Sequence, residues 1–206
     1  MPCGETKRIE RNEQKMIPVG YMYKKIAIVA DLDWFQSDSV KDIYSVSGCV
    51  SSDFCDYINY WKHNKFWFFD TPAIMEGIAT NESLDLSSMV LLYYEVYEEE
   101  YNDKTNCWQP LAPESFVDPS WLTNMILPKE KQLKGFDVVS YSIPSSHEHS
   151  PLSCNHLFET IPVNRHCLFE TFDEAKNALN RGAFAYPHCE PGPYRIIAVH
   201  TVLRFE

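Results

Sequence analysis

Residues 89–98 read MVLLYYEVYE, the longest stretch of the chain with the composition of a central β-strand. Aromatic and branched aliphatic side chains suit the half-buried surface of a sheet, and they fill most of this run. A helix needs about 20 apolar residues to cross a bilayer, and this run is much shorter. We therefore expect residues 89–98 to form the centre of a sheet around which the remaining chain is arranged.

Further strand-like runs lie on both sides of this stretch. Each is short, rich in aromatic or branched side chains, and bounded by turn-forming residues. They are residues 23–30, 42–50, 106–111, 135–143 and 194–205. We expect residues 106–111 to pair with the central strand, and residues 194–205 to close the chain as a strand of the same sheet.

Three segments carry helix start signals. In the first, the polar residues Ser51, Ser52 and Asp53 would cap a helix that continues through Asn64. The sequence DTP at 70–72 places a proline in a first helical turn, where its missing N–H costs no hydrogen bond. We expect that helix to continue to about residue 79. Thr171 and Glu174 have the spacing of a capping box, which predicts a helix over residues 172–181.

Strands and helices follow one another without a regular β-α-β alternation. This order predicts an α+β single domain, with a mixed, mostly antiparallel sheet and about three helices. No internal repeat is visible in the sequence. Residues 1–15 are polar and mixed in charge, and we expect them to be a disordered leader or the product of a mis-called start codon. Residues 16–206 then form the domain.

The composition excludes several classes of protein. Asp and Glu number 29 against 18 Lys and Arg in 206 residues, which gives a net charge of −11 and argues against nucleic acid as a partner. No apolar run reaches the length of a membrane span or of a signal-peptide core, so no membrane association is expected. Seven cysteines without a CxxC pair indicate reduced thiols rather than a disulfide framework, and hence a cytoplasmic protein.

The negative charge is concentrated in residues 66–128, which contain eleven acidic residues and one lysine. Within them, residues 93–101 alternate aromatic and acidic side chains. An exposed surface of this kind attracts a basic protein, because the rings supply contact area and the carboxylates steer association. The residues expected to bind it are Tyr93, Glu95, Tyr97, Glu98, Glu99, Glu100 and Tyr101. The alternative is a half-buried strand with packed tyrosines and solvated acids.

The leading functional hypothesis is therefore an acidic cytosolic binding protein that docks a basic protein partner. One concrete form is an immunity-type inhibitor, whose acidic surface would replace nucleic acid on a basic toxin or nuclease. This hypothesis requires no cofactor. A homo-oligomer, with its exposed aromatic residues at the subunit interface, is a further alternative.

A second hypothesis, from a different class, is a metal-binding protein or zinc-dependent hydrolase. Four potential ligands lie close together in the sequence, and imidazole with thiolate suits zinc. They are His147, His149, Cys154 and His156. Residues two apart in an extended segment point the same way, so each of the pairs 147/149 and 154/156 is suited to one metal ion. A solvated His-rich loop without metal is the alternative, because the spacing is not a standard zinc pattern.

Other catalytic signatures are weak or absent. Cys167 and Cys189 each follow a histidine, but adjacent residues on a strand point to opposite faces, so neither pair forms a dyad by itself. A dyad formed by residues that are distant in the sequence, such as Cys154 with His166, remains an alternative. The sequence contains no glycine-rich phosphate loop, no HExxH and no GxSxG, so classical nucleotide enzymes are poor candidates.

Six short strings are spread along the chain: PVGYMYK (18–24), DIYSVSGC (42–49), WKHN (61–64), WFFD (67–70), SPLSCN (150–155) and HCLF (166–169). Together they resemble a family of small bacterial proteins described only as hypothetical. The resemblance runs from about residue 17 to about residue 201 and leaves the leader unmatched. It implies a stand-alone bacterial domain, and it implies no activity.

Overall fold

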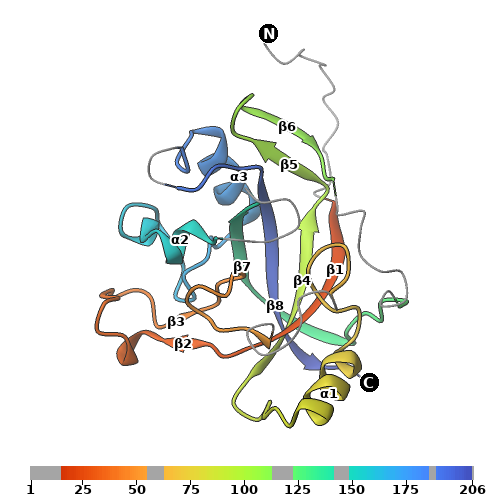
Figure 1. Ribbon diagram of the computed structural model, residues 1–206. Coiled ribbons are helices and arrows are strands. Elements are labelled where there is room, and N and C mark those ends of the chain that lie inside the picture. The colour runs from red at the N-terminus through yellow and green to blue at the C-terminus, as the bar shows by residue number, and fades with distance from the viewer. Residues whose placement is uncertain (1–14, 55–62, 113–122, 142–148, 186–188, 206) are drawn as a thin grey trace.

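The structure is a computed structural model, and it describes residues 15–54, 63–112, 123–141, 149–185 and 189–205. In these ranges the chain forms three α-helices and eight strands, with two short 3-10 turns, η1 and η5 (Figure 1). The elements are β1 (Met16–Lys24), β2 (Ala27–Ile28), η1 (Val29–Asp31), β3 (Asp42–Ile43), α1 (Pro72–Glu82), β4 (Val90–Tyr97), β5 (Glu99–Asn102), β6 (Cys107–Pro110), β7 (Glu130–Ser140), α2 (Pro151–Cys154), η5 (Leu157–Glu159), α3 (Phe172–Asn180) and β8 (Tyr194–Arg204).

Six of the strands form one antiparallel sheet, and β2 pairs with β3 outside it. The sheet has the order β1-β4-β8-β5-β6, and β7 pairs with β8 as well. β8 therefore lies at the centre and contacts three strands (Figure 1). The predicted α+β fold class and antiparallel sheet are confirmed.

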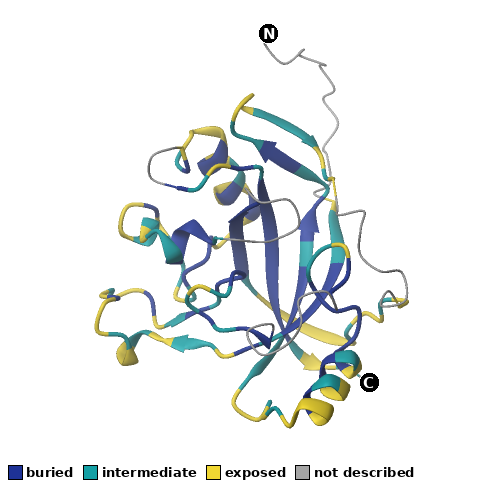
Figure 2. Cartoon of the chain, in the orientation of Figure 1, coloured by how far each residue is buried: buried dark blue, intermediate teal, exposed yellow. Residues whose placement is uncertain are grey.

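The central strands are buried on both faces, as Figure 2 shows. Successive side chains of β8 alternate between two apolar clusters, because neighbours on a strand point to opposite faces. Ile196 and Ala198 belong to the cluster that α3 covers, whereas Ile197 and Val199 belong to the cluster that α1 covers. The sheet thus separates two cores within a single domain.

The helices that cover the two cores, α1 and α3, belong to two similar halves of the molecule. In the first half, the chain runs from β1 through β2, η1, β3 and a turn to α1, and then to β4, which returns antiparallel to β1. In the second half, it runs from β7 through α2, η5 and a turn to α3, and then to β8, which returns antiparallel to β7. The halves join where β4 and β8 pair, and Tyr94 lies opposite Val199 there. The expectation that the chain has no internal repeat is therefore wrong at the level of structure.

One asparagine in each half organises the turn before the helix. The side-chain oxygens of Asn64 and Asn164 each accept two backbone N–H groups of their own turn, and their amide nitrogens donate to a carbonyl of β1 or β7. The partners are Phe66 N, Phe68 N and Val19 O for Asn64, and His166 N, Leu168 N and Lys134 O for Asn164, at 2.7 to 3.2 Å.

A glycine in each half lets the turn lie directly against the strand. Gly20 of β1 has a φ of +129° and Gly135 of β7 has a φ of +146°, a backbone conformation that other residues rarely adopt. A Cβ atom on either glycine would lie 2.6 Å from a carbonyl oxygen, that of Phe69 or Phe169. Both glycines also mark a shift in strand register. Backbone from the turn therefore occupies the space that a side chain would need.

The predicted elements agree with the structure where their local signals were strong. The strand predicted at 89–98 is β4, and two predicted helices are present as α1 and α3, the latter with its capping box. The third predicted helix, through Asn64, lies largely outside the described residues. The strand predicted at 106–111 is β6, but it pairs with β5 instead of the central strand. The strand predicted at 23–30 is wrong, because the long strand here is β1, which begins at Met16 and bends at Gly20. The predicted strand at 42–50 extends only over β3, and the chain then turns. Residues 1–14 of the predicted leader lie outside the described residues.

Candidate metal centre

Three side chains from two segments of the chain meet at the surface near the end of β7, and we call them the thiol–imidazole centre. They are Cys49, His149 and Cys154, and their ligand atoms all lie within 4.8 Å of one another. Cys49 lies in the turn after β3, His149 pairs with β7 as an isolated bridge, and Cys154 ends α2. The Sγ of Cys49 is 3.4 Å from the Nδ1 of His149.

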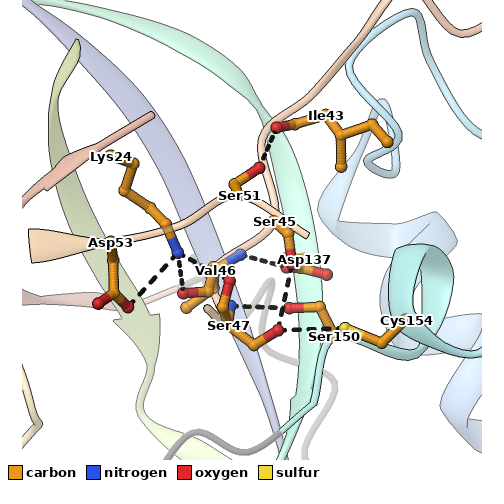
Figure 3. A network of polar contacts seen from close by, with 10 residues as sticks. All are labelled: Lys24, Ile43, Ser45, Val46, Ser47, Ser51, Asp53, Asp137, Ser150 and Cys154. Carbon is orange, nitrogen blue, oxygen red and sulfur yellow. Dashed lines mark hydrogen bonds and ion pairs between the residues drawn. The ribbon is translucent and has the colours of Figure 1, made fainter. Parts of the chain in front are cut away.

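A buried lysine forms hydrogen bonds with the turn that carries Cys49. The ammonium group of Lys24, on β1, donates to the carbonyls of Val46 and Ser47 at 2.7 and 2.8 Å (Figure 3). The side chain of Lys24 has no exposed surface, and the carboxylate of Asp53 lies 3.7 Å from its nitrogen. A charge buried this deeply is tolerated only where it is paired and hydrogen-bonded. Lys24 therefore fixes the backbone just before Cys49.

The same turn is tied to the segment that carries the other two ligands. The backbone N–H of Val46 donates to Asp137 of β7 at 2.9 Å, and that of Ser47 donates to the hydroxyl of Ser150 at 3.1 Å. The hydroxyl of Ser47 also lies 3.2 Å from the Sγ of Cys154 (Figure 3). These contacts fix the position of the turn relative to α2.

Asp137 is the buried carboxyl group of this network. Burial raises its pKa to about 7, although the N–H of Val46 and the hydroxyl of Ser150 partly offset the shift. Its second carboxyl oxygen, Oδ1, has no hydrogen-bond partner among the described residues. Asp137 therefore anchors the turn, and the free-energy cost of burying its carboxyl group is larger when that group is ionised.

The two thiols of the centre differ in acidity. The pKa of Cys49 is lowered to about 6, first because Cys154 donates a hydrogen bond to it, and further through Ser47 and the charge of Lys24. The pKa of Cys154 is raised, because Cys49 takes up that hydrogen bond and because Cys154 is more buried. The contact between the two thiols therefore shifts their pKa values in opposite directions.

His149 is oriented from three directions. Its backbone carbonyl accepts the N–H of Ser140 at 2.9 Å, which positions the residue beside β7. Its Nδ1 faces Cys49, and its Nε2 lies 3.7 Å from a carboxylate oxygen of Glu190. A metal-binding imidazole usually has a carboxylate or carbonyl at its other nitrogen, which fixes its tautomer and orientation. Glu190 lies where such a carboxylate is needed.

The structure brings together two of the four ligands expected from the sequence, His149 and Cys154. His147 lies outside the described residues. His156 is elsewhere, against the ring of Trp34, and its Nδ1 is 3.9 Å from the carboxylate of Glu159. No sequence signal marked the third ligand, Cys49, because its nearness to His149 arises only from the fold.

The remaining cysteines lie outside this centre. Cys167 and Cys189 are buried thiols, and burial raises the pKa of both. The assembled dyad left open in the sequence, Cys154 with His166, is not seen, because the imidazole of His166 bonds to Asp42 instead. Cys107 is disulfide-bonded, so the expectation of reduced cysteines is wrong for this residue.

The acidic, aromatic stretch of β4 and β5 is largely involved in contacts within the chain. Its tyrosines Tyr93, Tyr97 and Tyr101 are buried. Each of its four glutamates faces a basic group of the same chain: Glu95 lies 2.6 Å from Lys131 and 3.6 Å from His200, Glu98 3.1 Å from Lys15, Glu99 3.9 Å from Lys176 and Glu100 2.9 Å from Arg195. Docking of a basic partner to this stretch stays a prediction.

Comparison with known proteins found nothing similar, since no family model, no curated protein and no solved structure matches the chain. Within the described ranges, none of the helices has the length and apolar character that crossing a membrane requires. The side chains of the thiol–imidazole centre are therefore the basis on which a function is proposed.

Proposed function

We propose that this protein binds one divalent metal ion through Cys49, His149 and Cys154, and that the favoured ion is zinc. The observation that carries the proposal is the convergence within 4.8 Å of three ligand atoms from two segments that lie about 100 residues apart in the chain. In tetrahedral zinc sites with Zn–S near 2.3 Å and Zn–N near 2.0 Å, sulfur and nitrogen ligands lie about 3.5 Å apart. The 3.4 Å between Cys49 Sγ and His149 Nδ1 matches that edge.

The chemistry of the donor set favours zinc over magnesium or calcium. Thiolate and imidazole are soft or borderline ligands, whereas magnesium and calcium take oxygen. The lowered pKa of Cys49 favours the thiolate form that binds metal, and a bound cation would displace the proton of Cys154. Three protein ligands leave a fourth tetrahedral position for water or substrate, which is the ligand count of catalytic zinc sites.

The proposal is tested by zinc stoichiometry in matched variants. Purified protein is loaded with zinc, desalted, and measured by inductively coupled plasma mass spectrometry. We expect about one zinc per chain in the wild type and close to none in His149→Ala or Cys49→Ser. The control is His156→Ala, which removes the neighbouring exposed histidine and should retain the metal.

Circular dichroism of each variant separates loss of the site from loss of the fold. Equal zinc content in folded His149→Ala and folded His156→Ala would overturn the proposal, because zinc would then be bound elsewhere. So would a wild-type protein that retains no zinc after desalting.

A further inference from the structure

The two sulfur atoms of the thiol–imidazole centre are close to each other and unequally exposed. Cys49 is exposed at the surface, whereas Cys154 is only partly exposed and its Sγ lies 3.2 Å from the hydroxyl of Ser47. Both sulfurs lie within the same 4.8 Å limit as the imidazole. An S–S bond is about 2.05 Å long, so a movement of less than about 3 Å joins the two sulfurs.

We propose that Cys49 and Cys154 of the metal-free protein form a dithiol–disulfide couple that reduces small or protein disulfides. Cys49 is the attacking thiol and Cys154 the resolving thiol. This inference concerns the same site as the proposed function and rests on that function in one respect. Zinc bound there would occupy both sulfurs and block the reaction.

Exposure determines which sulfur reacts first. A disulfide substrate in solution meets Cys49, because Cys154 is shielded beside the turn and the other described thiols, Cys167 and Cys189, are buried. Gly48 precedes Cys49 and lacks a side chain, so the backbone next to the attacking sulfur has the freedom that closing the bond requires. The buried contacts of Lys24 with the turn lie before Gly48 and need not break.

The reaction balances as two exchange steps. The Cys49 thiolate attacks one sulfur of a substrate disulfide, forms a mixed disulfide and expels the other sulfur as a thiolate, which takes up a proton from solvent. Cys154 then loses its proton to solvent and attacks Cys49, which releases the second substrate thiol. One substrate disulfide is reduced to two thiols, and one protein dithiol is oxidised to a Cys49–Cys154 disulfide.

The test follows the mass of intact metal-free protein after treatment with oxidised glutathione. We expect the wild type to lose two hydrogen atoms without retaining glutathione, and peptide mapping to locate the bond between Cys49 and Cys154. In Cys154→Ser the reaction should stop at the first step, with one glutathione held on Cys49. In Cys49→Ser neither product should form, whereas the control Cys189→Ser should behave like the wild type.

Two outcomes would overturn the inference. One is a wild-type protein that keeps glutathione on Cys49 as Cys154→Ser does, because Cys154 would then not resolve the adduct. The other is a metal-free wild type that gains neither product.

These failures are distinguishable from failure of the proposed function. A protein that forms the Cys49–Cys154 bond but retains no zinc supports the redox couple alone. Zinc-loaded wild type that resists oxidised glutathione, while the metal-free form reacts, supports both.

Discussion

The Sγ of Cys49 lies 3.4 Å from the Nδ1 of His149, although the two residues are 100 positions apart in the chain. Neither residue belongs to a long helix or strand. Their separation is set instead by hydrogen bonds to the backbone near each residue. The side chains of Lys24 and Asp137 bind the turn before Cys49, and the N–H of Ser140 binds the carbonyl of His149. The ligands are therefore positioned before any metal binds, which reduces the entropy cost of binding.

If the turn is held by Lys24, replacing that lysine should weaken metal binding without touching a ligand. Lys24→Met removes the donor to two carbonyls and the cation beside buried Asp53. We expect a loss of about 3 to 5 kcal/mol in the free energy of unfolding, measured by urea denaturation, and weaker zinc binding.

Lys25→Met is the matched control, because the neighbouring lysine is exposed and should tolerate the same change within about 0.5 kcal/mol. Zinc affinity is compared by competition with a chromophoric chelator. An unchanged affinity in folded Lys24→Met would show that the turn does not need this support.

Asp137 predicts a specific pH dependence of stability. Its folded pKa of about 7 lies above the ordinary value of 3.8, so folding favours the protonated form. The stability that this group contributes is complete below about pH 4 and is lost as the pH rises through 7, by up to about 1.4 kcal/mol per pH unit.

An Asp137→Asn variant tests this dependence, because the amide cannot ionise and keeps an oxygen for the N–H of Val46. Metal-free Asp137→Asn should therefore gain stability relative to the wild type as the pH rises from about 4 to about 7, and the difference should level off above the folded pKa. Urea denaturation of both proteins in the presence of chelator measures it. Parallel stability curves would show that Asp137 ionises as readily in the folded state as in the unfolded state.

Glu190 should tune the metal affinity of His149 without binding the metal. Its carboxylate lies 3.7 Å from His149 Nε2, and removing such a partner typically lowers zinc affinity by about 10- to 100-fold. We expect this loss in Glu190→Gln, whereas Glu159→Gln, which alters the carboxylate beside His156, should leave the affinity unchanged. Equal affinities in the two variants would show that Glu190 does not support His149.

The paired glycines predict a contrast between three substitutions. Gly20→Ala and Gly135→Ala should each lose at least about 2 kcal/mol of stability, because a Cβ would meet a carbonyl oxygen at 2.6 Å on a backbone of positive φ. Gly77 lies in α1 with nothing within 4 Å of a new Cβ, so Gly77→Ala should be neutral or stabilise by up to about 1 kcal/mol. Thermal unfolding of the three variants measures the contrast, and similar midpoints would contradict it.

The parts of the fold that were predictable from sequence have local causes. The capping box of Thr171 and Glu174 and the proline that begins α1 act within one helical turn, so both helices were visible in the sequence. The repeat was not, because NKFWFFDT (64–71) and NRHCLFET (164–171) share little beyond the asparagine, a phenylalanine and the threonine that caps each helix. The turns are alike because their hydrogen bonds involve backbone atoms and one asparagine.

The candidate site was predicted only in part, for the same reason. His149 and Cys154 are close in sequence and could be paired there, but Cys49 joins them through a fold that brings residues 42–50 beside α2. The acidic stretch was judged from its own charge, whereas Lys131, Lys176 and Arg195 reach it from distant parts of the chain. Contacts between segments that are distant in the sequence therefore determine both the ligand set of the metal centre and the surroundings of the acidic stretch.

X-ray absorption at the zinc K edge of the zinc-loaded protein tests the central claim most directly. Binding at the thiol–imidazole centre predicts two sulfur ligands at about 2.3 Å and one imidazole nitrogen at about 2.0 Å in the wild type. In zinc-loaded Cys49→Ser, any zinc that remains should show a single sulfur. A shell of nitrogen and oxygen alone, or two sulfur ligands that persist in Cys49→Ser, would contradict a metal centre built on Cys49, His149 and Cys154.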